Sequence, residues 1–205
     1  MDHPAFFDSL LPCLYPASFL TFPPICVILL VTNENLKKSE DVMKRESYIS
    51  WDQYFMGVAL LASMRSKDPN TQVGACIVDR ENRILSTGYN GFPMGCSDDV
   101  FPWERNGGFL ETKYPFVVHA ELNAILNAHG KNLVGSRIYV DLFPCHECAK
   151  AIIQAGISEI IYLYDKYAQT ESTIASKKML EAAGVVFRRA QFEDDSITLN
   201  FARKD

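Results

Sequence analysis

The sequence lacks the features that mark several broad classes of protein. It has no excess of basic residues, because 20 Lys and Arg face 25 Asp and Glu for a formal net charge of −5. Proteins that bind nucleic acids usually carry a basic field, so this balance argues against a polynucleotide partner and leaves a single nucleotide possible. Six cysteines in 205 residues are too few for a disulfide scaffold. Internal repeats are also absent.

What is present is an ordinary globular composition, with 48% hydrophobic and 22% charged residues. A length of 205 residues fits one domain, or one domain with an appendage. We therefore expect two parts: an N-terminal extension over residues 1–42, which is apolar and rich in proline, and one folded domain over residues 43–205.

The extension has no charged residue between positions 9 and 33, which is long enough to suggest a membrane helix. Four prolines interrupt this stretch, and no Lys or Arg precedes it, so neither a spanning helix nor a secretory leader fits well. We favour the interpretation that translation begins at Met43. The alternatives are a membrane or surface anchor and a disordered or docked extension. We expect no membrane attachment.

The pattern from residue 50 onward is that of an α/β protein. Ser50 and Gln53 have the spacing of a capping box at a helix start. Periodicity and turn residues predict helices at 50–64, 118–129, 144–155 and 171–183, and strands at 73–78, 84–89, 137–141, 157–164 and 185–189, with a further edge strand at 197–201. This order predicts one central sheet with helices on both faces. The long irregular stretch between the second strand and the second helix is of a kind that is usually functional or disordered.

Two short motifs carry the candidate chemistry: H-x-E at 119–121 and P-C-x-x-C at 144–148. Together they form the signature of zinc deaminases. Cys145 and Cys148 are three residues apart, so they share one face of a helix. They also lie at its first turn, where the free N–H groups favour thiolates. With His119 they supply three ligands and leave a fourth position for water, as in a catalytic zinc site.

Glu121 is two residues from His119, so its carboxylate must lie near that water. A carboxylate there can take a proton from water and pass it on, which hydrolytic deamination requires. The competing interpretation is a structural zinc site with four protein ligands. The candidates for a fourth ligand are Cys76, Cys96, His129 and His146. Cys76, His129 and His146 are poorly suited, and we favour the catalytic site.

These motifs lie within longer segments that resemble the deoxycytidylate (dCMP) deaminases of the zinc-dependent cytidine deaminase superfamily. The resemblance covers about residues 50–189. It is carried by the segments at 65–70, 88–99, 119–125 and 143–150. It implies a three-layer α/β/α fold with a central mixed five-stranded sheet. It also implies one catalytic Zn²⁺ per subunit on His119, Cys145 and Cys148, with Glu121 as the proton shuttle.

The resemblance further implies a set of substrate contacts. The backbone of Ala120 would contact the base, Asn90 would hydrogen-bond the nucleoside, and Tyr167 would pack on the substrate. Arg65 and Lys67 are candidates for the 5′-phosphate, because a loop with two basic side chains suits a dianion. The alternative for these two residues is a solvated helix end.

Proteins of this family are often homohexamers that dCTP activates and dTTP inhibits, and we expect this protein to be cytoplasmic. The segment at 91–99 resembles the part associated with that effector site, which makes Gly91, Gly95, Asp98 and Asp99 the candidates. The alternative is that these residues only form turns. The resemblance thus implies dCMP as substrate, dCTP and dTTP as effectors, and a homo-oligomer, with no nucleic-acid partner.

Three other functions remain open. A nucleic-acid deaminase uses the same zinc centre but needs a basic, aromatic groove for the strand. A deaminase of the riboflavin pathway would not need the 65–70 and 90–99 segments in this form. A silent nucleotide-binding or competence-associated protein could keep the fold, although it would have no use for Glu121.

Overall fold

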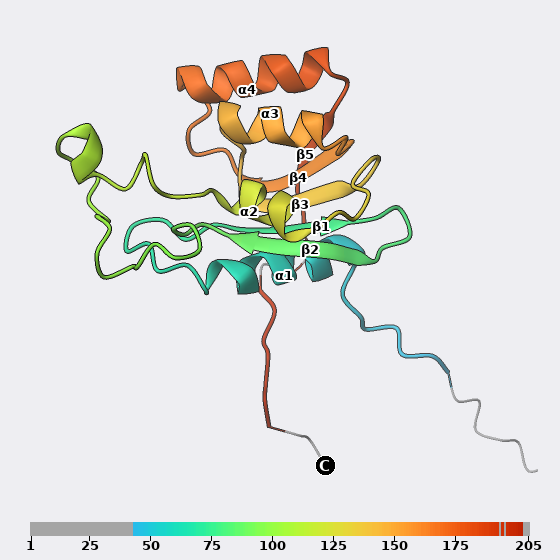
Figure 1. Cartoon of the computed structure of the whole chain (residues 1–205). Coiled ribbons are helices and arrows are strands. Elements are labelled where there is room, and N and C mark those ends of the chain that lie inside the picture. The colour runs from blue at the N-terminus through green and yellow to red at the C-terminus, as the bar shows by residue number, and fades with distance from the viewer. Residues whose placement is uncertain (1–42, 193, 195, 203–205) are drawn as a thin grey trace, which may run out of the picture. The chain divides into compact units, whose positions relative to one another are not determined.

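The computed structural model describes residues 43–192, 194 and 196–202 (Figure 1). The expectations for residues 1–42, including the start of translation and the possible anchor, lie outside these residues. The described residues from Glu46 onward form one compact unit. In the part of the chain that is described, no helix is long and apolar enough to cross a membrane.

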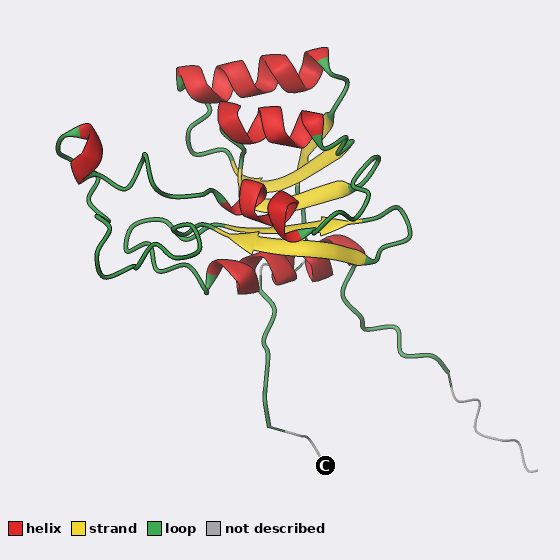
Figure 2. Ribbon diagram, viewed as in Figure 1, coloured by secondary structure: helices red, strands yellow, loops and turns green. Residues whose placement is uncertain are grey.

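The described residues form four α-helices, one short 3₁₀ helix and five strands (Figure 2). In chain order they are α1 (Trp51–Ser63), β1 (Gly74–Val78), β2 (Ile84–Tyr89), η1 (Phe109–Glu111), α2 (Ala120–Asn127), β3 (Arg137–Leu142), α3 (His146–Gln154), β4 (Glu159–Tyr164), α4 (Glu171–Ala182) and β5 (Val186–Arg189). The elements expected between residues 50 and 189 are present, with ends shifted by a few residues.

The strands form one mixed sheet in the order β2-β1-β3-β4-β5. β1 is antiparallel to both of its neighbours, whereas β3, β4 and β5 run parallel. Because β2 and β3 are each antiparallel to β1, they also point the same way. The mixed five-stranded sheet is therefore confirmed.

The topology explains which helices cover which face of the sheet. The connections through α2, α3 and α4 all join strands of one direction and all advance toward β5. Right-handed crossovers place such helices on the same face. Accordingly, α2, α3 and α4 share one core with the sheet, and α1 packs on the opposite face (Figures 1 and 2). The three layers are confirmed, with three helices in one outer layer and one in the other.

The start of α1 follows the capping box. The Ser50 hydroxyl accepts a hydrogen bond from the Gln53 backbone N–H at 3.2 Å, and the Ser50 N–H donates to the Gln53 side chain at 3.0 Å. One face of the helix is then buried against the sheet through Phe55, Met56 and Ala59. The cap and the apolar spacing together position this helix, as the sequence indicates.

The start of α2 sits directly on the backbone of β2. A Cβ atom added to Gly88 would lie 2.3 Å from both the Ala120 carbonyl oxygen and the Ala124 nitrogen. Only glycine permits so close an approach of helix and strand. This contact fixes the first turn of α2, which carries His119 and Glu121, at the end of the sheet.

The prediction of an edge strand at 197–201 is wrong. The described residues of that segment are irregular, and Ile197 and Leu199 instead line a groove along α1. The Ile197 Cδ1 atom lies 3.3 Å from the position that a Cβ atom on Gly57 would occupy. The alternating apolar side chains of this segment thus pack on a helix. The spacing of apolar residues alone does not distinguish such packing from pairing with a strand.

Candidate metal centre and substrate pocket

The two predicted motifs meet at the N-termini of two helices. His119 is the N-cap of α2, and Cys145 is the N-cap of α3. The His119 Nδ1 atom lies 3.3 Å from the Cys145 Sγ atom and 3.5 Å from the Cys148 Sγ atom. All three ligand atoms lie within 4.8 Å of one another, which is close enough for one metal ion. The donor set of one imidazole and two thiols suits Zn²⁺.

The charges of these groups also suit a divalent cation. Hydrogen bonding from the Cys148 thiol and then from His119 lowers the pKa of Cys145 to about 3. The hydrogen bond to Cys145 raises the pKa of His119 to about 9. The neighbouring Cys145 sulfur and burial raise the pKa of Cys148 well above its usual range. A metal ion would replace the protons shared among the three groups, since its ligands must be deprotonated.

Among the described residues, the group that could hold a metal contains only these three ligands. Cys76 is fully buried on β1 in the core beneath α1. The His146 ring turns to α4, where its Nδ1 lies 2.7 Å from the Ser172 hydroxyl. This arrangement leaves a coordination position open, as a catalytic zinc site requires.

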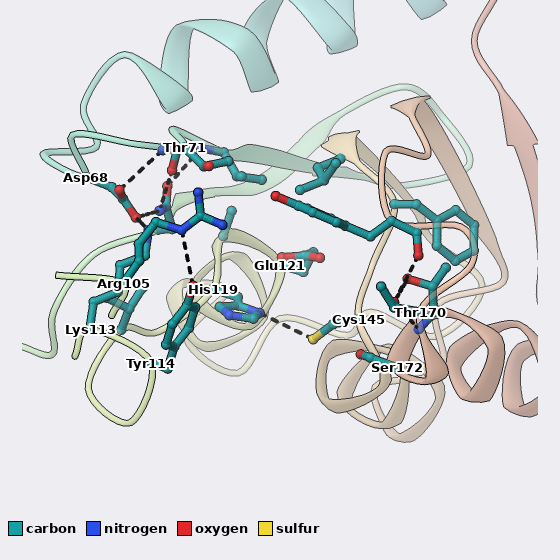
Figure 3. Close-up of a pocket in the computed structure, with 18 residues that line it drawn as sticks. Asp68, Thr71, Arg105, Lys113, Tyr114, His119, Glu121, Cys145, Thr170 and Ser172 are labelled. Atoms are coloured by element: carbon teal, nitrogen blue, oxygen red, sulfur yellow. Dashed lines mark hydrogen bonds and ion pairs between the residues drawn. The ribbon is translucent and has the colours of Figure 1, made fainter. Parts of the chain in front are cut away.

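Glu121 lies in the first turn of α2 and is only 4% exposed. Burial raises its pKa to about 7, against the opposing effect of the His119 charge. A carboxyl group with a pKa near neutrality can both accept and donate a proton. Figure 3 shows Glu121 beside His119 in the pocket. The residue therefore has the position and the acidity of a proton shuttle.

The metal centre and Glu121 lie in a pocket with a volume of about 400 Å³, within the usual range for small-molecule sites. Its walls come from the loop after α1, the long loop before α2, the start of α3, and the segment from β4 to α4 (Figure 3). The lining residues used below are Asp68, Asn90, Arg105, Lys113, Tyr114, Ala120, Tyr167 and Ser172.

One wall is tied together by the buried carboxylate of Asp68. It forms an ion pair with Lys113 and accepts hydrogen bonds from the Asn70 and Thr71 backbone N–H groups. Burial raises the pKa of Asp68, but the Lys113 and backbone hydrogen bonds outweigh it and hold that pKa below its usual value. Because both charged side chains are buried, removing one would leave the other uncompensated.

Asn90 belongs to the same knot. Its amide donates to Asp68 at 3.3 Å and to the Thr71 carbonyl at 2.9 Å, and its oxygen accepts from the Val73 N–H at 2.8 Å. The side chain therefore fixes the loop after α1 to the end of β2. An amide oxygen has a second lone pair, so a contact with a substrate stays possible.

The structure brings most of the predicted site residues together. His119, Ala120, Glu121 and Cys145 line the pocket, as do Asn90 and Tyr167, while Cys148 completes the metal group. Arg65 and Lys67 do not line it. The Lys67 ammonium instead pairs with the Asp98 carboxylate at 2.5 Å and is 64% exposed. The proposed phosphate role of these two residues stays a prediction.

The segment predicted to bind effectors begins next to the residue that precedes His119. Gly91 forms a two-way backbone bridge with Val118, at N···O distances of 3.1 and 2.9 Å, directly before His119. The Asp98 carboxylate forms an ion pair with Lys67, and the Asp99 side chain is exposed. The backbone of Gly95 has a positive φ of 89°. The effector role of these residues stays a prediction.

Sequence reasoning missed several residues of the pocket lining, among them Arg105, Lys113 and Tyr114. These three lie in the irregular stretch that precedes α2, where no periodic pattern marks individual side chains. The signal that could have found them is the position of two cations and a tyrosine shortly before the H-x-E motif.

Comparisons with known proteins agree with this geometry. The family model for the cytidine and deoxycytidylate deaminase zinc-binding region matches residues 49–164. A probable deoxycytidylate deaminase of Drosophila melanogaster is 55% identical over 172 residues, covering 81% of this chain and 85% of the fly protein. The deoxycytidylate deaminase of Homo sapiens is 53% identical over 159 residues, covering 77% of this chain and 89% of the human protein.

A solved structure is also similar, the dCMP deaminase of the cyanophage S-TIM5 in complex with dCMP and dUMP. It has a TM-score of 0.54 and 27% identity, and the match covers 72% of this chain and 99% of the phage chain.

The fold and the three-ligand centre define a zinc-dependent deaminase. More specifically, the chain belongs to the cytidine and deoxycytidylate deaminase zinc-binding family. The resemblance noted in the sequence is thereby confirmed.

Proposed function

We propose that the protein catalyses the hydrolytic deamination of dCMP to dUMP and ammonia and so feeds the synthesis of dTMP. The observation that carries this proposal is the buried Glu121 carboxyl beside the His119, Cys145 and Cys148 group, in a pocket of nucleotide size. The similarity to deoxycytidylate deaminases along most of the chain supports dCMP in particular.

The protein's residues divide the work of the reaction. His119, Cys145 and Cys148 would hold the zinc ion, which when bound lowers the pKa of a coordinated water. Glu121 takes a proton from the attacking water as oxygen adds to C4 of the cytosine ring. It delivers this proton to ring nitrogen N3. It then takes the remaining proton from the hydroxyl on C4 and passes it to the amine, so that the C4–N bond breaks, the C4 carbonyl forms and ammonia leaves. Burial of Glu121 keeps its pKa near neutrality, so both directions of transfer are accessible.

The other predicted contacts position the substrate. We assign the base to the backbone of Ala120 and the nucleoside to the remaining lone pair of Asn90. Tyr167 closes one side of the pocket. The sequence assigns the 5′-phosphate to Arg65 and Lys67, outside the pocket lining.

We also propose regulation by dCTP as activator and dTTP as inhibitor. The bridge between Gly91 and Val118 supports an effector site at 91–99, because a shift of that segment would move the residue next to His119. Assembly as a homohexamer would cover apolar side chains such as Leu61 and Met64, which α1 leaves exposed. A reducing compartment such as the cytoplasm would keep the Cys145 and Cys148 thiols available.

The test is ammonia release by the purified full chain with dCMP, CMP, deoxycytidine and cytosine, each alone, with dCTP and with dTTP. We expect turnover of dCMP, raised by dCTP and lowered by dTTP. Turnover of dCMP without an effector response would remove the regulation and keep the chemistry. A folded, zinc-loaded protein that deaminates none of the four would contradict the proposed function. Analytical ultracentrifugation tests the hexamer separately.

A further inference from the structure

Arg105 has a different environment from every other charged group that lines the pocket. It belongs to a loop whose base is closed by a backbone hydrogen bond from the Lys113 N–H to the Glu104 carbonyl, at 2.9 Å. Arg105 and Tyr114 flank this closure on the two sides. The Arg105 Nε donates to the Tyr114 hydroxyl at 3.2 Å. In Figure 3 the guanidinium group points into the pocket.

The remaining donors of Arg105 have no partner in the described part of the chain. The Tyr114 contact occupies only Nε, and the two terminal nitrogens form neither a hydrogen bond nor an ion pair there. The contact with Tyr114 holds the side chain in one direction and, as the first cause, raises the pKa of Arg105 further. A planar pair of free N–H groups matches the oxygens of a phosphate.

The charge balance of the pocket leaves Arg105 as its uncompensated cation. The only other basic side chain in the lining that is not a metal ligand is Lys113, which Asp68 neutralises. Two thiolates would neutralise Zn²⁺ in the metal group. Arg105 is therefore the basic side chain of the lining that no ion pair neutralises, and an anionic group of the substrate would find its cationic partner there.

From this geometry we infer that Arg105, held by Tyr114, binds the 5′-phosphate and makes the enzyme select nucleotides over nucleosides. This inference rests on the proposed function and replaces Arg65 and Lys67 as the phosphate ligands. Arg105 contacts the substrate far from the reacting carbon, so it is a specificity residue. Its removal should affect the phosphorylated substrate and spare the chemistry.

The experiment compares dCMP with deoxycytidine in the full-length variants Arg105→Gln, Arg105→Lys and Tyr114→Phe. Arg105→Gln should lower kcat/KM for dCMP about 100-fold, with deoxycytidine changed less than about threefold. Arg105→Lys should recover part of the loss, because Lys offers charge without the planar fork. Tyr114→Phe should raise KM for dCMP several-fold, with kcat nearly unchanged. Arg83→Gln, on an exposed turn outside the pocket lining, is the matched control.

Binding of dUMP and deoxyuridine, measured by calorimetry, supplies the same ratio without turnover. The inference would be overturned if Arg105→Gln weakened turnover or binding of the nucleotide and of the matching nucleoside equally, or if it left the nucleotide-to-nucleoside ratio unchanged. A selective loss in Arg65→Gln or Lys67→Gln instead would also overturn it. Failure of the proposed function looks different, because the wild type would then bind dUMP in preference to deoxyuridine yet release no ammonia from dCMP. Zinc content and melting temperature verify that each variant is folded.

Discussion

The floor and the rim of the pocket are built in different ways. The floor consists of His119, Glu121, Cys145 and Cys148, which lie at the first turns of α2 and α3. The rim consists of Asp68, Asn90 and the loop from Glu104 to Tyr114, which hydrogen bonds hold together across long sequence separations. Residues on one helical turn are neighbours wherever the helix lies, whereas rim residues become neighbours only in the folded chain. Floor variants should therefore remove chemistry, and rim variants should change stability or selectivity.

The largest effect is expected from the floor. Glu121→Gln keeps the shape of the side chain and removes its proton transfer. Turnover of dCMP should fall by at least about 1,000-fold, with zinc content and melting temperature close to those of the wild type. Steady-state ammonia release and metal analysis measure both quantities. Glu147→Gln, an exposed carboxylate on the same α3 turn as the cysteines, is the control and should remain active. Retained dCMP turnover in Glu121→Gln would contradict the claim that the floor residues carry out the chemistry.

The next effect belongs to the rim. Lys113→Met leaves the Asp68 carboxylate buried without its cation, and both side chains are less than a tenth exposed. We expect a loss of about 3 to 5 kcal/mol in the free energy of unfolding, measured by urea denaturation. Lys113→Met combined with Asp68→Asn should recover part of the loss. A loss below about 1 kcal/mol in the single variant would show that the rim does not depend on this pair.

A stabilising change is expected at Asp141, on β3, where its carboxylate accepts a hydrogen bond from the Gly74 N–H at 3.1 Å. Burial raises the pKa of Asp141 to about 6 from 3.8, although backbone hydrogen bonds oppose the shift. The folded protein therefore keeps a proton that the unfolded chain releases between about pH 4 and 6. Stability should fall as pH rises through that window.

Asp141→Asn keeps the acceptor and removes the buried charge. It should raise the free energy of unfolding by about 2 to 3 kcal/mol at pH 8 and by almost nothing at pH 4. Thermal melts across this pH range measure the difference. Asp165, Lys166 and Arg189 are the other charged residues that line the same cavity as Asp141. An equal gain at both pH values would contradict the assigned titration.

The smallest effect is expected far from the pocket. Ser50→Ala removes the side-chain acceptor of the capping box at α1, so we expect a loss of about 1 kcal/mol in stability. Ser50→Asp should retain most of the cap. Both variants should keep the ratio of dCMP to deoxycytidine turnover, because α1 lies on the face of the sheet opposite α2 and α3. A changed ratio would mean that the two faces are coupled.

Sequence reasoning succeeded where the information is local. The capping box at Ser50, the elements between residues 50 and 189, and the metal group all follow from spacing along the chain. It failed at 197–201, because an alternating apolar segment can pack on a helix as well as pair with a strand. It also overlooked Arg105 and Lys113, since irregular loops carry no period from which the direction of a side chain can be inferred.

The amino-acid sequence by itself determined the chemistry of this protein, because a deaminase centre needs particular donors at helix starts and His119, Glu121, Cys145 and Cys148 carry that spacing within their own segments. Only the tertiary structure decided which cations are paired and which one lines the pocket without an ion-pair partner. Lys67 is drawn away by Asp98 and Lys113 is neutralised by Asp68, which leaves Arg105 directed into the pocket. Such pairings depend on segments that meet only after the sheet and its crossovers have formed, so no local pattern encodes them.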